Sequence, residues 1–299
     1  MNSLAPIVLF VYDRPDHTRF TVESLKENQL ATESNLVIFS DAAKDSDAEQ
    51  CVQKVREYLK TISGFRTVTI IERNRNFGLS ASIIDGVSSI VNNYGKVIVV
   101  EDDLITSKYF LQYMNEGLTL YQNDLEVISL HGYVYPVQVP LPETFFICGA
   151  DCWGWATWKR GWDIFQSDGR ELLLRLKEQR REFAFDWDGQ YGNLKMLKRQ
   201  ISGEVNSWAI RWHASAFLQN KLTLYPGISL VNNIGGDQFG THTKSLVEFQ
   251  TDISRRPIQL KRLPMQENMQ ARQTFVDFFK TVHQSVIRRI IRRIVSMVS

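Results

Sequence analysis

Three consecutive acidic residues, Glu101, Asp102 and Asp103, follow an apolar run that is rich in β-branched residues. Aspartate is disfavoured inside strands and unpaired like charges repel one another, so this cluster is locally unfavourable. A divalent cation would compensate for it, because Mg²⁺ and Mn²⁺ prefer hard oxygen ligands. The alternative is that Asp103, Thr106 or Ser107 caps a following helix. The triplet predicts a metal site if the fold places suitable partners beside it.

Apolar runs alternate with stretches of helical spacing through the first 125 residues or so. The expected strands cover 6–12, 36–39, 68–71 and 97–100, and the expected helices cover 18–29, 47–63, 80–93 and 108–122. This alternation predicts an α/β fold in which a mostly parallel sheet has helices on both faces. Ligands of such sheets bind at the carboxyl ends of the strands.

Polar residues stand at the carboxyl ends of all four expected strands. Tyr12 and Arg14 follow the first strand, Asp41 follows the second, and a loop with Asn76 and Gly78 follows the third. The acidic triplet follows the fourth. Parallel strands end at one edge of a sheet, so we expect these residues to converge on a site for a phosphorylated ligand.

Composition narrows the classes of function. The net charge is +2, and residues 286–299 contain four arginines and no acid, so the rest of the chain sums to −2. A nearly neutral body argues against a nucleic-acid partner. The three cysteines lack the spacing of a zinc site and are expected to be reduced thiols of a cytosolic protein. The first apolar run has no charged region before it, which favours a strand over a signal peptide.

The pattern changes beyond residue 125. A fifth strand is expected at 127–130, and an aromatic region follows in which all seven tryptophans lie between Trp153 and Trp212. We expect most of these rings to fill a core and one or two to serve as platforms for the apolar face of a sugar. The region 130–245 is therefore interpreted as a subdomain on the acceptor side of a site.

In order and spacing, these motifs resemble the GT-A class of nucleotide-sugar glycosyltransferases, and more closely family-2-like bacterial enzymes and Golgi N-acetylglucosaminyltransferase I. The resemblance is carried by residues 6–14, 39–41, 99–104, 154–155 and 235–242 and covers about residues 5–245. It implies a Rossmann-like GT-A domain with a nucleotide-sugar half at 1–129 and an acceptor-binding, catalytic half at 130–245. A connecting segment at 246–281 and a basic amphipathic helix at 282–299 would follow.

The resemblance also implies roles at the nucleotide. Tyr12 and Arg14 would meet the base or the diphosphate, and Asp41 would accept a hydrogen bond from uracil, which favours a UDP-sugar donor. Asn76 and Gly78 would let the chain pass close to the nucleoside.

For the metal, the resemblance implies Mn²⁺ or Mg²⁺ bound directly by Asp103. Glu101 would orient the triplet and Asp102 would face the ribose. His242, late in the chain, matches a position that reaches the metal or the diphosphate in such enzymes. A structural hydrogen bond is the alternative role for this histidine.

An inverting transferase needs a general base for the acceptor hydroxyl. The family position falls near the Ser207-Trp208 pair, where relatives often carry aspartate, but this chain has Asn206, and an amide cannot accept the proton. The available carboxylates are Asp151, which leads into the aromatic region, and Glu204. Either could instead be a surface acid or a cap.

The tail from Val286 to Val298 has a separate pattern. At 100° per residue its isoleucines and valines fall on one half of a helix and its four arginines fall on the other. Such a helix is only about 20 Å long, too short to cross a bilayer. We expect residues 286–298 to lie on an anionic membrane surface. The alternative is a helix packed on the body or against another copy.

Together these patterns predict a metal-dependent, inverting glycosyltransferase that is peripheral on the cytoplasmic face of the membrane. Its donor would be a UDP-sugar, and its acceptor a glycan or a lipid-linked glycan of the kind that precedes a surface polysaccharide or oligosaccharide. One rival is a non-catalytic nucleotide-sugar or glycan-binding protein on a decayed transferase fold. The other is a sugar nucleotidyltransferase, which should show a glycine-rich phosphate loop where this chain has Tyr12-Asp13-Arg14-Pro15.

Overall fold

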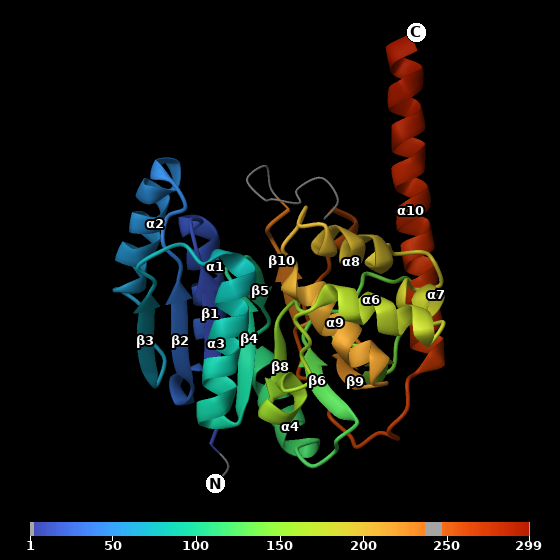
Figure 1. Cartoon of the computed structure of the whole chain (residues 1–299). Helices are drawn as coiled ribbons and strands as arrows, with labels where there is room; N and C mark the ends of the chain where they lie inside the picture. Colours follow the sequence, from blue (N-terminus) through green and yellow to red (C-terminus); the bar gives the residue numbers. More distant parts are fainter. Residues whose placement is uncertain (1–2, 237–246, 299) are drawn as a thin grey trace.

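The computed structural model describes residues 3–236 and 247–298 and centres on an eight-stranded sheet (Figure 1). The strand order is β3-β2-β1-β4-β8-β6-β9-β7. Only β7 and β8 run antiparallel to their neighbours. The predicted α/β fold with a mostly parallel sheet is therefore confirmed. The strands of this sheet are β1 (Ile7–Val11), β2 (Asn35–Ser40), β3 (Thr67–Glu72), β4 (Lys96–Glu101), β6 (Val127–His131), β7 (Thr144–Cys148), β8 (Trp155–Trp158) and β9 (Leu222–Pro226).

A second, two-stranded sheet pairs β5 (Leu104–Thr106) with β10 (Val231–Asn233) in antiparallel register. The helices of the first half are α1 (Pro15–Lys26), α2 (Ser46–Leu59), α3 (Gly78–Tyr94) and α4 (Phe110–Leu120), with a 3₁₀ turn, η1 (Ala31–Glu33). Those that follow are α5 (Lys159–Trp162), α6 (Gly169–Glu178), α7 (Glu182–Phe185), α8 (Asn193–Ile201), α9 (Trp208–Leu218), η2 (Val247–Phe249) and α10 (Met269–Val298).

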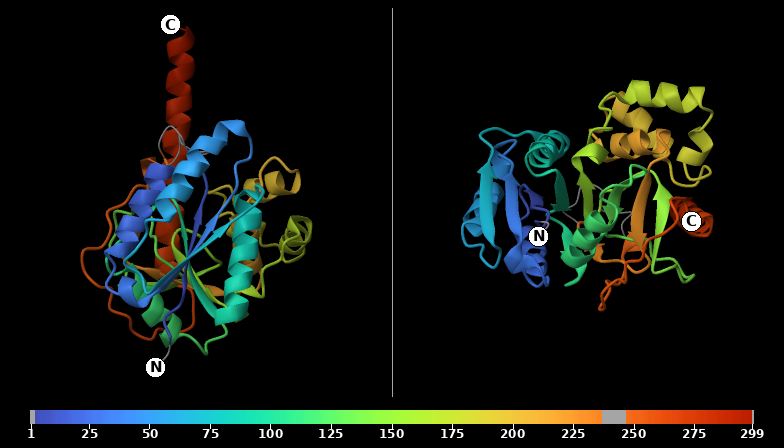
Figure 2. Two further views of the ribbon diagram at one scale, coloured as in Figure 1. Left: turned by 90° about the vertical axis from the view of Figure 1, so that its left-hand side faces the viewer. Right: turned by 90° about the horizontal axis from the view of Figure 1, so that it is seen from below.

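Helices cover both faces of the sheet, as Figure 2 shows for α1 and α2 on one side of the first strands and α3 on the other. The alternation of side chains along β1 explains this arrangement. Ile7, Leu9 and Val11 belong to the core beneath α1, α2, α4 and α10. Val8 and Phe10 belong to the opposite core, beneath α3 and α9. Both faces of the strand are apolar, which is why the sequence reads as an unbroken hydrophobic run.

Local signals fix where the helices near the site begin and end. Helix α1 starts at Pro15, three residues earlier than predicted, because proline suits the first helical position. Asp45 caps α2, its carboxylate accepting the N–H of Ala48 at 3.2 Å. Helix α3 ends at Gly95, which has a φ of 75° and whose N–H donates to the carbonyl of Val91.

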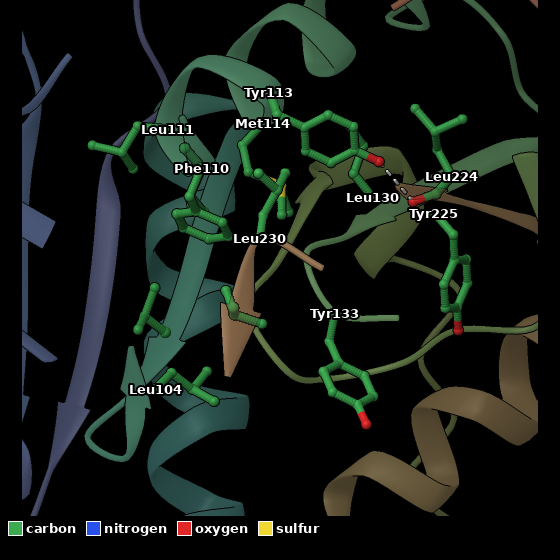
Figure 3. Packing of buried hydrophobic residues seen from close by; sticks show 14 of the residues in the cluster. Leu104, Phe110, Leu111, Tyr113, Met114, Leu130, Tyr133, Leu224, Tyr225 and Leu230 are labelled. Atoms are coloured by element: carbon green, nitrogen blue, oxygen red, sulfur yellow. Dashed lines mark hydrogen bonds between the residues drawn. The ribbon is translucent and has the colours of Figure 1, made fainter. Parts of the chain in front are cut away.

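The second half of the chain extends the same sheet. Strand β8 inserts between β4 and β6 and pairs antiparallel with both, so the sheet continues across the predicted division at residues 129 and 130. Beneath β6 and β9, side chains from α4 fill the core (Figure 3), where the hydroxyl of Tyr113 donates to the carbonyl of Leu224 at 3.3 Å. A smaller core joins α6, α7, α8 and α9.

The last helix, α10, begins at Met269, well before the predicted start at 282. Asn268 accepts the N–H of Ala271 at 2.9 Å and so caps the first turn. Phe275 and Phe279 are buried in the main core, which anchors this end of the helix. From there α10 rises beyond the body of the protein (Figure 1). None of the helices in the described part of the chain is long and apolar enough to cross a membrane.

Candidate functional site: two adjoining pockets

The carboxyl ends of the parallel strands open into a cavity of about 520 Å³, which we call the triplet pocket. This volume lies within the range of small-molecule sites. Every candidate nucleotide-binding or metal-binding residue that the structure describes lines it: Tyr12, Arg14, Asp41, Asn76, Gly78, Glu101, Asp102 and Asp103. His242 lies outside the described residues.

Asp103 pairs with the arginine of the first loop. Nη1 of Arg14 lies 3.2 Å from Oδ2 of Asp103, and both side chains are about four-fifths buried, at 20% exposure. Oδ1 of Asp103 accepts a hydrogen bond from Asn233 at 3.4 Å. Helix α4 begins at Phe110 with no side-chain cap. The helix-capping alternative for Asp103 is therefore wrong, because its carboxylate is engaged inside the pocket.

The segment after β10 packs directly on the triplet. The N–H of Ile234 donates to the backbone carbonyl of Asp103 at 2.8 Å, which continues the β5–β10 pairing. A Cβ at Gly235 would collide with the carboxylate of Asp103, so only glycine allows this approach. Gly235, the first residue of the predicted 235–242 motif, thus lies against the acidic triplet, and residues 237–242 of the motif lie outside the described residues.

The three carboxyl groups share an enclosed environment. Burial, together with the charges of Asp103 and Asp102, holds the pKa of Glu101 well above its ordinary value. Burial and Asp103 raise the pKa of Asp102 to about 7, and burial also raises the pKa of Asp103. Arg14 opposes all three shifts. Arg14 only partly offsets the burial and mutual repulsion of the three acids, and a bound cation would favour their ionised forms.

Within residues 3–236 and 247–298, no group of three or more His, Cys, Asp or Glu side chains is arranged to hold a metal ion by itself. Mg²⁺ is usually held by one or two carboxylates, with waters and substrate phosphates completing its shell. The residues present therefore fit a cation that is bound together with a diphosphate, and they do not form a complete protein cage.

Asp41 connects the loop after β2 to the loop before α3 by hydrogen bonds. Its carboxylate accepts the N–H groups of Ala42, Phe77 and Gly78 at 2.9, 2.9 and 2.8 Å. Asn76 adds a cross-link by donating to the carbonyl of Ala42 at 2.7 Å. The N–H of Phe77 also reaches the second oxygen at 3.2 Å, so all of the roughly four acceptor positions of this carboxylate are engaged. These bonds hold the start of α3 against the loop after β2.

Aromatic rings form the neighbouring wall of the triplet pocket. Phe10 and Phe39 stack with ring centroids 5.3 Å apart, and both line the cavity. The hydroxyl of Tyr12 accepts the N–H of Lys44 at 3.0 Å, and both residues line the cavity. The pocket thus joins an apolar, aromatic wall to an acidic one, as a ligand with a planar base and charged phosphates would require.

A second cavity of about 620 Å³, the aromatic pocket, adjoins the first, and Trp153 lines both. Asp151 lines this second cavity with a side chain that is 27% exposed. Six further aromatic side chains contribute to its wall, alongside polar residues such as Asp186, Asn193 and Lys195: Tyr135, Trp187, Tyr191, Tyr225, Phe249 and Phe279. Trp153 and Trp187 line this cavity, although Trp187 is also buried in the main core, and the other five tryptophans, Trp155, Trp158, Trp162, Trp208 and Trp212, are buried in the core away from it.

The two candidate bases lie in different environments. Asp151 lines the aromatic pocket two residues before the shared Trp153, and its Oδ2 accepts the hydroxyls of Tyr135 at 3.0 Å and Tyr225 at 3.3 Å. Glu204 lines neither pocket. Its side chain is 60% exposed, and it accepts hydrogen bonds from Arg199 and Ser202, of which the Ser202 bond lowers its pKa most.

Several lining residues had no signal in the sequence. Tyr135 and Tyr225 are separated by 90 positions, and Phe279, Val282 and His283 come from α10, so only the folded chain brings them together. Asn233 and Gly235 could have been noticed, since an Asn-x-Gly sequence after a short apolar run favours a turn.

The sequence matches no family model and no curated protein. Among solved structures, the mannosyltransferase PcManGT from Pyrobaculum calidifontis in complex with GDP-Man and Mn²⁺ aligns with 44% of this chain and 35% of its own, at 13% identity and a TM-score of 0.33. Residues 1–349 of S. aureus TarS align with 50% of this chain and 41% of their own, at 15% identity and a TM-score of 0.34. A UDP-glucose pyrophosphorylase complexed with UDP-glucose aligns with 75% and 90%, at 11% identity and a TM-score of 0.36.

The chain thus spans well under half the length of the first two structures. Because identity and superposition are both this low, the function has to be inferred from the two pockets themselves.

Proposed function

We propose that this chain is a metal-dependent, inverting glycosyltransferase that moves a sugar from a UDP-sugar to a glycan acceptor. The observation that carries the proposal is the junction of the two pockets. On one side, Asp103, Arg14 and Asp41 meet in a cavity of nucleotide size. On the other, Asp151 faces a separate aromatic cavity across Trp153. Transfer between two substrates needs such a pair of adjoining sites.

In the donor site, Arg14 would hold the diphosphate, Asp102 the ribose and Asp41 the uracil, which would replace the longer of the two Phe77 bonds, at 3.2 Å. Mn²⁺ or Mg²⁺ held by Asp103, with Glu101 behind it, would stabilise the charge that develops on the leaving diphosphate. Donors that are fixed before the reaction cost no reorganisation during it, and the Arg14–Asp103 pair already stands in place.

Other residues complete the donor site. Tyr12, Asn76 and Gly78 would border the nucleoside, since all three line the triplet pocket. His242 remains the further expected contact to the metal or the diphosphate.

For the acceptor, Asp151 is the stronger candidate for the general base. Its carboxylate opens into the cavity beside the donor site, whereas Glu204 is on the surface and paired with Arg199. A base must reach the proton that it removes, directly or through one water. Asp151 would take the proton of the acceptor hydroxyl as the sugar is transferred with inversion.

The acceptor would be a glycan on a lipid carrier, presented at the cytoplasmic face of the membrane. The support is the continuity of α10, whose residues Phe279 and Val282 line the aromatic pocket. The same helix continues into 286–298, where one half of the sequence pattern is apolar and the other carries four arginines. Such a segment binds reversibly to anionic lipid and would bring the pocket close to the membrane surface.

A calorimetric titration tests the donor site. Asp103→Asn should weaken Mn²⁺-dependent binding of UDP, because it removes the carboxylate proposed to bind the metal directly. Loss of an outer-shell partner of a metal typically reduces metal affinity by about 10- to 100-fold, so we expect a loss of at least this size. The matched control is Asp16→Asn, which alters an exposed acid paired with Arg19 on the nearby helix α1 and should leave UDP binding unchanged. Equal affinity of Asp103→Asn and the unmodified chain would refute the metal assignment.

A further inference from the structure

The carboxylate of Asp151 is held from three directions. Both phenol hydroxyls, of Tyr135 and Tyr225, donate to Oδ2, and the N–H of Cys152 donates to Oδ1 at 2.8 Å. Burial is the main cause that holds the pKa of each phenol well above its ordinary value, so both remain protonated donors. Both acceptor positions of Oδ2 are occupied by phenols, whereas Oδ1 accepts one backbone N–H, so Oδ1 is the oxygen that would take a proton; the thiol of Cys152, a weak donor, also hydrogen-bonds to this carboxylate.

His131 lies close to the carboxylate of Asp151 but does not occupy an acceptor position of Oδ1. Nε2 of His131 lies 3.9 Å from Oδ1 of Asp151, but it accepts the N–H of Trp153 at 3.1 Å. Burial lowers the pKa of His131, which keeps the ring neutral. The orientation of Asp151 therefore depends on the tyrosines and on its own loop.

Tyr135 is in turn fixed by α10. Its ring contacts Phe275 and Phe279 with centroid separations of 4.8 Å each, and Phe278 at 5.7 Å. Phe275 is fully buried. Edge-to-face contacts of this kind orient a ring as well as burying it. One turn of the last helix thus determines where the hydroxyl of Tyr135 points.

We propose that Tyr135 is a positioning residue for Asp151, and that α10 keeps it in place. The inference rests on the proposed transferase function, because it assigns Tyr135 to the carboxylate that takes the acceptor proton. The phenol fixes Oδ2, so that Oδ1 faces the position of the attacking hydroxyl beside the donor site. Small losses of alignment at such a position are costly, since a displacement of about 1 Å can reduce the rate about 100-fold.

The test is the rate of UDP release, with water as acceptor, from the UDP-sugar that turns over fastest among UDP-glucose, UDP-galactose and UDP-N-acetylglucosamine. Tyr135→Phe retains the ring and removes only the hydroxyl. We expect kcat to fall between about 10-fold and 100-fold. The KM for the donor should not change, because Tyr135 does not line the triplet pocket.

The matched control is Tyr133→Phe. The hydroxyl of Tyr133 donates to the carbonyl of Phe249 at 2.7 Å, so this variant loses a buried phenol hydroxyl without touching Asp151. It should retain the kcat of the unmodified chain. An equal fall of kcat in both variants, or no fall in Tyr135→Phe, would overturn the proposal.

A second substitution tests the part of α10. The ring of Phe278 contacts Tyr135 but lines neither pocket. Phe278→Leu should therefore lower kcat in the otherwise unmodified chain, but it should cause no further fall of kcat in the Tyr135→Phe variant. Additive effects would contradict the link through Tyr135. If the unmodified chain turns over no UDP-sugar, the proposed function is wrong and this inference is wrong with it. If it does turn over a UDP-sugar and Tyr135→Phe leaves kcat unchanged, only this inference is wrong.

Discussion

At the scale of single residues, the two candidate bases, Asp151 and Glu204, differ in their surroundings in the folded chain. Asp151 and Glu204 are both carboxylates near tryptophans, but Asp151 lines a cavity beside the triplet pocket, whereas Glu204 is exposed. A general base needs access to a bound substrate and a fixed orientation, and only the Asp151 carboxylate is held by buried phenols. These environments are our reason for proposing Asp151 over Glu204, two candidates that the sequence left nearly equal.

Conservative amide substitutions test this ranking. Asp151→Asn should reduce turnover of the UDP-sugar by about 100-fold or more, which is the usual contribution of a general base, while donor affinity stays unchanged. Glu204→Gln should retain full turnover, because the side chain lies on the surface. Steady-state kinetics on both variants gives the answer. Equal turnover of the two variants would refute the assignment of Asp151.

At the scale of elements, α10 connects two parts of the proposed mechanism. Its first turns are buried through Ala271, Phe275 and Phe279, and Arg272 pairs with both carboxylate oxygens of Asp188 at 2.9 and 2.7 Å. Its last turns contain the arginine-rich pattern of residues 286–298. A helix rises about 1.5 Å per residue, so the pocket rim at Val282 and the residue 298 are about 24 Å apart along one axis.

Truncation after His283 tests the membrane role of α10 without removing the residues that line the aromatic pocket. The shortened chain should no longer co-sediment with vesicles of phosphatidylglycerol and phosphatidylcholine, because each basic residue near an anionic surface contributes about 1 kcal/mol. Vesicles of phosphatidylcholine alone are the control for charge. Full retention of co-sedimentation by the truncated chain would count against the membrane hypothesis.

Local signals explain which elements the sequence could predict. The first four strands are continuous apolar runs, and Pro15 and Gly95 mark helix ends, so these elements were found within a few residues. Pairings between distant segments have no such signal. The sequence does not reveal that β8 lies antiparallel between β4 and β6, or that β10 brings Gly235 to Asp103, because these pairings join segments more than 20 residues apart and leave no local signal.

The same distinction applies to the site. The acids and polar residues at the ends of the first four strands could be predicted as one cluster, since parallel strands end at one edge. The roles of individual groups could not, as Asp41 shows by accepting three backbone N–H groups. Tyr135 was missed because its contact with Asp151 requires the packing of α10 against β7 and β9.

At the scale of the whole molecule, one continuous sheet carries both pockets. The triplet pocket lies at the ends of β1, β2 and β4, and the aromatic pocket lies beside it, between the second half of the sheet and α10. Trp153 is common to both linings. This arrangement would bring the donor sugar and the acceptor hydroxyl together at one boundary, with the three acids on the donor side and a group of aromatic rings on the acceptor side.

The most direct test of this arrangement is UDP release from a panel of UDP-sugars, measured with Mn²⁺ and again with EDTA, and compared with GDP- and dTDP-sugars. We expect turnover of at least one UDP-sugar that depends on the metal and falls to background in EDTA. Binding of UDP with no release under any metal condition would instead support a nucleotide-sugar-binding protein. Release that is unaffected by EDTA would contradict the role assigned to Asp103.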